Sequence, residues 1–182
     1  MMKLRHALRG VVPAISILLT GCATTNKPAA PVVPSSLQAP STEVLFLQGH
    51  AVGSQIYECQ ASHDDPTHYD WVFKAPEAQL FDRAGKRIIT HFAGPSWQAT
   101  DGSIVVGDVV AKDNGPDPMA IPWLLLRAKS TSGNGPLSHT LSIQRLNTQG
   151  GKAPPGGCGA SLVGSELRVH YAADYLFYTA RR

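Results

Sequence analysis

The sequence predicts an all-β protein, an antiparallel β-sandwich or barrel of roughly eight to ten short strands. Short runs rich in β-branched and aromatic residues recur through the last three quarters of the chain. Clusters of Gly, Pro, Asn and Asp separate these runs, and no segment holds a helical period beyond two turns. The apolar share of 43% and the charged share of 16% fit one globular domain.

The expected strands follow from these runs and from the turn signals between them. They lie at 54–61, 69–75, 78–82, 86–92, 103–111, 121–130, 138–148 and 173–180. The turn signals are "DRAGK" from 82, "TDGS" from 100, "KDNGPDP" from 112 and "SGNGP" from 132. Alternation is clearest in "TLSIQRL", where Leu141, Ile143 and Arg145 share one face of the strand.

The N-terminus has the pattern of a secretory signal peptide, which we place at residues 1–21. Lys3, Arg5 and Arg9 precede an apolar run, "VVPAISILLTG", that is too short for a membrane-spanning helix. The following "LTGC" resembles the lipobox of bacterial lipoproteins. This resemblance implies that Cys22 is lipidated and, because Ala23 follows it, that the protein is anchored in the bacterial outer membrane, facing the periplasm.

Residues 22–42 are rich in Pro, Ala, Ser and Thr with almost no charge, which predicts a flexible tether ahead of a single β-rich domain at 43–182. The formal charge of +3 comes from 16 basic and 13 acidic residues, and three of the basic ones lie in the signal segment. The chain without that segment is therefore neutral. No basic stripe with interleaved aromatic residues remains, so we expect no nucleic-acid partner.

The cysteine count agrees with an exported protein. With Cys22 assigned to lipid, Cys59 and Cys158 remain as a pair. We expect a disulfide between them in an oxidising periplasm, the alternative being two free buried thiols. The bridge would pin the glycine-rich connection 148–166 across the sheet, and the absence of a Cys-x-x-Cys motif argues against a redox role.

The segment "HFAGPSWQATDGS" (91–103) concentrates candidate functional side chains. Its "GPSWQ" begins like a Gly-x-Ser-x-Gly nucleophile elbow but ends in Gln, and the proline before Ser96 suits a turn. We expect chiefly an architectural role, with Trp97 packed on the sheet, Asp101 ordering the "DGS" turn and His91 on a strand. The alternative is a catalytic loop in which His91 and Asp101 assist a nucleophile.

Other chemistry has weaker support. The segment "HDDPTHYD" (63–70) is rich in ligand-type residues but matches no zinc or calcium template, so we expect a solvated loop and neither a metal nor a cofactor. Glu58 and Glu166 lie beside the expected disulfide, yet nothing in the sequence places them in one cleft. Catalysis thus has no strong candidate residue.

A binding site has more support than a catalytic one. Tryptophan and tyrosine offer planar apolar surfaces with polar tips, and we expect a ligand site to combine His91, Trp97, Asp101 and Trp123. Tryptophans on strands also serve as core residues. Both interpretations stay open for Trp97 and Trp123.

Several segments resemble a secreted bacterial and fungal family catalogued as domain of unknown function 3455. They are "QIYECQ" (55–60), "HFAGPSWQATDGSIVVG" (91–107), "IPWLLLRA" (121–128), "LSIQRLNTQGG" (141–151), "PGGCG" (155–159) and "YAADYLFY" (171–178). The likeness covers most of residues 43–180 in the same order. It implies one exported, β-rich domain and carries no assigned activity.

We therefore expect an exported, lipid-anchored β domain that acts as a binding or cell-envelope interaction module rather than an enzyme. Its expected partners are the membrane, through the lipid on Cys22, and a small-molecule, glycan or envelope-protein ligand. The alternative is a hydrolase whose catalytic residues are assembled from separate loops.

Overall fold

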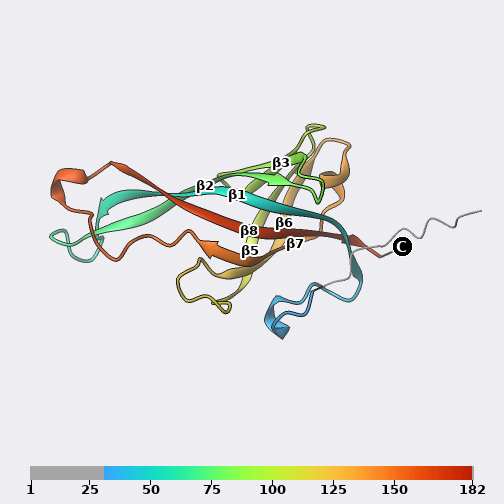
Figure 1. Ribbon diagram of the computed structural model, residues 1–182, viewed down its shortest axis with the longest axis horizontal. Coiled ribbons are helices and arrows are strands. Elements are labelled where there is room, and N and C mark those ends of the chain that lie inside the picture. Colours follow the sequence, from blue (N-terminus) through green and yellow to red (C-terminus); the bar gives the residue numbers. More distant parts are fainter. Residues whose placement is uncertain (1–30, 182) are drawn as a thin grey trace, which may run out of the picture.

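The computed structural model describes residues 31–181, which form a closed antiparallel barrel (Figure 1). Its strands are β1 Glu43–Ala61, β2 Tyr69–Phe81, β3 Arg87–Phe92, β4 Ser96–Ala99, β5 Ile104–Asp113, β6 Trp123–Ser132, β7 Ser142–Gly150 and β8 Glu166–Ala180. Each strand pairs with the next, and β8 pairs with β1 to close the ring. The predicted all-β class is confirmed, and the architecture is the barrel rather than the sandwich.

Short 3-10 helices complete the fold: η1 Ser35–Leu37, η2 Pro136–His139 and η3 Ala160–Leu162. Within residues 31–181 no helix has the length and apolar character needed to cross a membrane. The expected signal peptide and Cys22 lie outside the described residues.

Two differences from the expected strands have physical reasons. The runs expected at 69–75 and 78–82 form one strand, β2, which continues through Pro76. Pairing of β2 with β3 begins only at Ala78, so the missing N–H of Pro76 interrupts no ladder on that side. The segment 91–103 contains β4, whose four residues are too few to show an alternating pattern.

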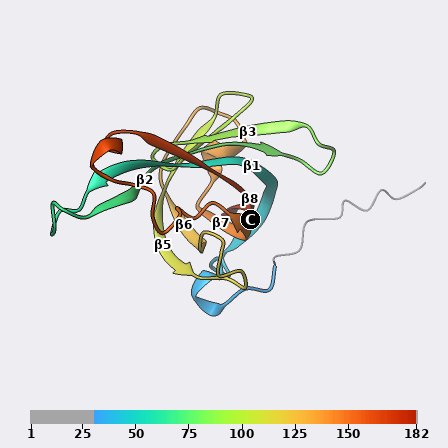
Figure 2. The same ribbon diagram turned by 60° about the vertical axis from the view of Figure 1, so that its left-hand side comes forward.

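The up-and-down order gives the barrel two distinct ends. The β1–β2, β3–β4, β5–β6 and β7–β8 connections lie at one end, which we call the mouth, and the other connections lie at the closed end. Glu43 at the start of β1 pairs with Ala180 at the end of β8, so both termini of the barrel lie at the closed end. Figure 2 shows the strands curving around their common interior.

Aromatic residues fill the interior toward the closed end. Trp97, Tyr175 and Phe177 are fully buried, and their rings meet edge to face. Gly107 makes room for Trp97, because a Cβ at this position would lie 3.1 Å from the indole ring. Leu137 of η2 is fully buried in the same cluster, so the β6–β7 connection covers this end of the barrel.

A second apolar cluster lies outside the barrel, under residues 31–42. Leu37 of η1 is fully buried against Leu146, Leu176 and Tyr178. The Gln144 side-chain amide donates to the Leu37 carbonyl at 2.6 Å, which fixes η1 to β7. The part of the expected tether that the structure describes thus packs on the barrel, because Leu37 supplies an apolar anchor that its Pro- and Ser-rich surroundings hide in the sequence.

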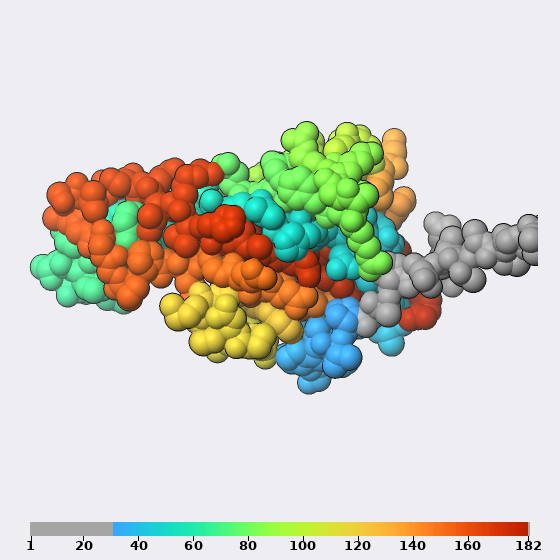
Figure 3. Space-filling model, in the orientation of Figure 1, coloured from blue at the N-terminus to red at the C-terminus, as the bar shows by residue number. Residues whose placement is uncertain are grey.

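Beyond the mouth, three strands continue as a thin sheet that we call the extension. It comprises residues 54–61 of β1, 69–77 of β2 and 166–170 of β8, together with the connection 152–165. β1 is the central strand, and β2 and β8 pair with it from either side. The extension forms the left end of the molecule in Figures 1 and 3.

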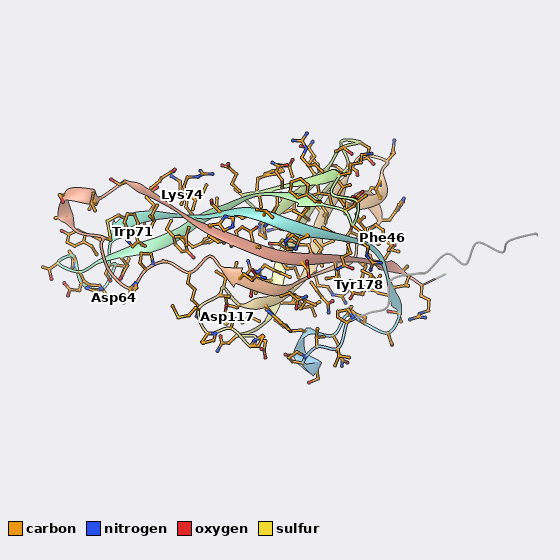
Figure 4. The ribbon with its side chains drawn as sticks, viewed as in Figure 1. Phe46, Asp64, Trp71, Lys74, Asp117 and Tyr178 are labelled. Atoms are coloured by element: carbon orange, nitrogen blue, oxygen red, sulfur yellow. A yellow bond between two sulfur atoms is a disulfide. The ribbon has the colours of Figure 1, made fainter. Side chains whose placement is uncertain are left out.

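A disulfide joins Cys59 on β1 to Cys158 in the 152–165 connection, which confirms the predicted pairing. The Trp71 indole N–H donates to the Gly156 carbonyl at 3.1 Å and holds the same connection from β2. Figure 4 shows Trp71 and Lys74 on the extension and Tyr178 toward the closed end. The connection is therefore tied to two strands, as expected for a glycine-rich segment with little apolar surface of its own.

Candidate functional site

The barrel interior is open at the mouth, where it forms a cavity of about 490 Å³. This volume lies within the range of about 300–1,000 Å³ typical of small-molecule sites. The wall of the cavity contains residues of all eight strands and of the turns beside β4 and β6. The lining residues are Gln55, Tyr57, Phe73, Lys74, Pro76, His91, Gly94, Pro95, Trp97, Val109, Ile121, Pro122, Leu124, Leu126, Arg145 and Tyr175.

His91 and Trp97 line this cavity as a stacked aromatic pair. They are direct cross-strand partners on β3 and β4, and their rings stack with centroids 4.4 Å apart and planes 7° from parallel. His91 Nδ1 lies 2.8 Å from the Ser96 carbonyl oxygen, to which it must donate, so Nε2 is the acceptor nitrogen. Burial lowers the pKa of His91 to about 3, so the imidazole is neutral at physiological pH.

Arg145 on β7 brings a positive charge to the cavity. It faces inward like Ile143, two residues before it, which lies in the interior cluster. Its Nε and Nη2 both donate to the Pro122 carbonyl, at 3.1 and 2.9 Å. Among residues 31–181 no carboxylate forms an ion pair with Arg145, and none lines the cavity.

Three fully or almost fully buried polar groups of the lining have no hydrogen-bond partner within the described part of the chain. They are the Gln55 side-chain nitrogen, the Tyr175 hydroxyl and the Trp97 indole nitrogen. The buried Tyr171 hydroxyl also lacks a hydrogen-bond partner of normal geometry there. It lies near Tyr175 and Gln55, and both side chains contribute to the shift of its pKa. Buried polar atoms are normally paired, so this group of donors is an unusual feature of the interior.

The rim of the cavity is apolar and exposed. Phe73 and Val109 are 50% and 51% exposed, although large apolar side chains usually avoid solvent. Tyr57 meets Phe73 edge to face with ring centroids 5.8 Å apart, and its hydroxyl donates to the Gly151 carbonyl at 2.6 Å. Burial raises the pKa of Tyr57, so this phenol is neutral. The entrance of the cavity thus offers apolar surface. The ionisable side chains of the lining other than Lys74 lie deeper inside the cavity.

The structure brings together only two of the four residues expected at a ligand site. His91 and Trp97 line the cavity, whereas Asp101 lies in the β4–β5 turn at the closed end. Asp101 Oδ1 accepts from the Ser103 backbone N–H and hydroxyl, at 2.8 and 2.6 Å, which is the predicted turn-ordering role. Trp123 packs against the outer cluster beside Gly115. Ligand binding by any of the four stays a prediction.

Two other groups of candidate residues adopt clear arrangements. Glu58 and Glu166 are direct cross-strand partners, and Lys74 bonds to both carboxylates at 2.6 and 2.8 Å. The Lys74 ammonium lowers the pKa of Glu58, so Glu58 is held as a carboxylate and is poorly suited to act as a proton donor. In the segment 63–70 all side chains except the half-buried Tyr69 are exposed, and within the described residues no group of three metal ligands gathers.

Sequence reasoning missed Arg145 and Gln55 as members of the site. One signal was present, since the alternation in "TLSIQRL" already placed Arg145 beside Ile143 on one strand face. This alternation could not show which face of β7 points into the barrel. Both faces of the strand are buried, one in the interior and the other under η1.

A wider depression of about 890 Å³ lies at the closed end, outside the barrel. Its only ionisable lining side chains are His139 and Arg181, and Arg181 Nε already donates to the Ser41 carbonyl at 3.2 Å. The cavity at the mouth combines enclosure, aromatic walls and unpaired polar groups, so we take it as the candidate site.

The fold and the cavity define a closed, eight-stranded, up-and-down β-barrel with a hollow at one end and a covered core at the other. The family comparison agrees with this single unit. The chain belongs to the family described as "Protein of unknown function (DUF3455)", whose model matches residues 40–179. No curated protein and no solved structure matches the chain.

Proposed function

We propose that this domain is a binding module whose barrel cavity takes a small, largely apolar molecule. The observation that carries the proposal is the cavity itself, with its stacked His91–Trp97 wall and exposed Phe73 and Val109 at the entrance. Exposed apolar surface around a concave opening favours ligand capture, since burial of that surface drives association.

The alternative, a hydrolase assembled from separate loops, has less support. The cavity lining contains no serine, threonine, cysteine or carboxylate side chain in the part of the chain that the structure describes. His91 Nδ1 is held by the Ser96 carbonyl, and no hydroxyl or thiol of the lining, apart from phenols, stands ready as a nucleophile. These features favour binding without turnover.

Neutral phenylnaphthylamine, whose fluorescence rises in apolar surroundings, tests the proposal. Val109→Trp at the rim should narrow the entrance and weaken probe binding about tenfold or more, because the indole would occupy apolar lining surface. Val110→Trp is the matched control, since Val110 is similarly exposed, at 55%, but does not line the cavity. Absence of probe binding, or equal affinities for both variants, would contradict the proposal.

We also propose that the domain is exported and anchored in the outer membrane through lipid on Cys22, facing the periplasm. The support is the basic and then apolar N-terminal segment followed by "LTGC". Metabolic labelling with a fatty acid should mark the wild-type chain and leave Cys22→Ser unlabelled. Cys22→Ser should also leave the membrane fraction or accumulate as uncleaved precursor, and an unlabelled wild-type chain would contradict the anchor.

A further inference from the structure

We infer that the cavity selects ligands that carry an anionic group, of the carboxylate class, and that Arg145 binds this group. The inference rests on the proposed binding function and names the chemistry of the ligand. It is carried by a cation without a counter-charge and by buried donors without acceptors in one cavity.

The cavity contains a cation, Arg145, without a carboxylate partner among the described residues. Arg145 and Lys74 are the permanent cations of the lining, and the charge of Lys74 is more than balanced by the two carboxylates of Glu58 and Glu166. Arg145 is not neutralised, because its contacts in the described residues are to the neutral Pro122 carbonyl. That carbonyl holds Nε and Nη2, and Nη1 has no acceptor among residues 31–181, so the guanidinium is fixed in place with donor capacity remaining.

Buried hydrogen-bond donors lie in the same cavity as Arg145. The side-chain nitrogen of Gln55 and the hydroxyl of Tyr175 line the cavity, are buried, and lack acceptors within residues 31–181. Burial keeps Tyr171 protonated, since it raises the pKa of this neighbouring phenol. All these groups can donate, and a carboxylate, which only accepts, satisfies several donors at once.

The remaining lining of the cavity indicates an apolar body for the ligand. The His91–Trp97 stack, Leu126 and Phe73 supply flat and apolar surface in the same cavity. His91 is neutral, and Arg145 is the one cation of the lining without a carboxylate partner in the described residues, which fits a monoanion better than a phosphate dianion. The geometry therefore favours a compact aromatic or apolar carboxylate whose ring lies against the aromatic wall.

A pair of probes of the same shape tests the charge preference. Naphthoate and the neutral naphthamide differ mainly in charge, and calorimetry on the wild-type protein should show naphthoate binding about tenfold tighter or more. Equal affinities for the two probes would overturn the anion inference while leaving the binding function intact. If neither these probes nor phenylnaphthylamine binds, the binding function itself is wrong.

Variants assign the preference to Arg145. Arg145→Met should reduce naphthoate affinity about tenfold or more and leave naphthamide within about twofold, since only the charged contact is lost. Arg168→Met is the matched control, because Arg168 pairs with Glu77 at 2.7 Å on the extension and does not line the cavity. If Arg145→Met does not fold, Arg145→Lys keeps the charge without the planar fork and should retain part of the preference. An Arg145 variant that folds and keeps the full preference would overturn the assignment.

Discussion

The barrel body and the extension share three strands, β1, β2 and β8, yet the two regions are held together differently. In the body these strands enclose fully buried aromatic residues such as Trp97 and Phe177. In the extension no enclosed core exists among the described residues, and β2 is largely exposed from Asp70 to Lys74. A three-stranded sheet open to solvent cannot bury enough apolar surface to fix itself, so specific ties replace burial.

These ties are of three kinds: a disulfide, a side-chain hydrogen bond and ion pairs between strands. The disulfide joins Cys59 to the 152–165 connection, and Trp71 bonds the same connection. Lys74 and Glu166 bring the outer strands β2 and β8 together across β1, as do Glu77 and Arg168. The comparison therefore predicts that core truncation affects the whole molecule, whereas loss of a tie affects mainly the extension.

The largest effect should come from the body. Trp97→Ala should lower the free energy of unfolding by about 3–5 kcal/mol, as for other buried aromatic truncations. Trp71→Ala in the extension should cost only about 1–2 kcal/mol, since it removes partly exposed surface and one hydrogen bond. Urea denaturation of both variants measures the two values, and equal losses would contradict the distinction between body and extension.

The disulfide should rank next. Replacing both cysteines, as Cys59→Ala with Cys158→Ala, opens a loop of sequence separation 99. The expected loss is about 2–4 kcal/mol. Hydrogen exchange should speed up in residues 54–61 and 166–170 before it changes in the barrel strands β3 to β6. Uniform acceleration over all strands would show that the bridge supports the barrel itself.

His91 should make the free energy of unfolding of the barrel body depend on pH. Its folded pKa of about 3 lies below the unfolded value of about 6.5, so the unfolded chain binds more protons between these values. Stability from this residue is complete above pH 6.5 and falls as the pH drops toward 3, by up to about 1.4 kcal/mol per pH unit. The positive charge of Arg145 adds to the lowering of the His91 pKa, and Tyr175 packs edge to face against the imidazole.

The variant His91→Phe keeps a ring against Trp97 but cannot take up a proton. Its stability, measured by urea denaturation between pH 7 and pH 4, should fall less steeply than that of the wild type. The wild-type and variant slopes would coincide if His91 were accessible and protonated in the folded protein.

The smallest effect should come from the surface ion pairs of the extension. Lys74→Met leaves Glu58 and Glu166 side by side and should lower the melting temperature slightly at low salt. Added salt should remove the difference, because exposed charges are screened. A loss that persists at high salt would mean that packing of the lysine stem, rather than its charge, ties β2 to β8.

The sequence allowed the fold class, the disulfide and the Asp101 turn to be predicted, because each depends on local chemistry or on counting. Barrel closure depends on pairing between Glu43 and Ala180, at opposite ends of the domain, and no local pattern encodes it. The same limit applies to the site. His91 and Trp97 are near in sequence and were found, whereas Arg145 and Gln55 join them only after the ring closes.

The position of the chain termini gives the molecule a direction. The Arg181 backbone N–H donates to the Thr42 carbonyl at 2.8 Å, so the chain enters and leaves the barrel at one pole, and the hollow opens at the other. With a lipid on Cys22, the proposed anchor attaches at the pole where the chain enters. Under that proposed anchor the hollow would face away from the attachment point, so the proposed ligand would reach it from the aqueous side, and the disulfide-tied extension would be the first surface that it meets.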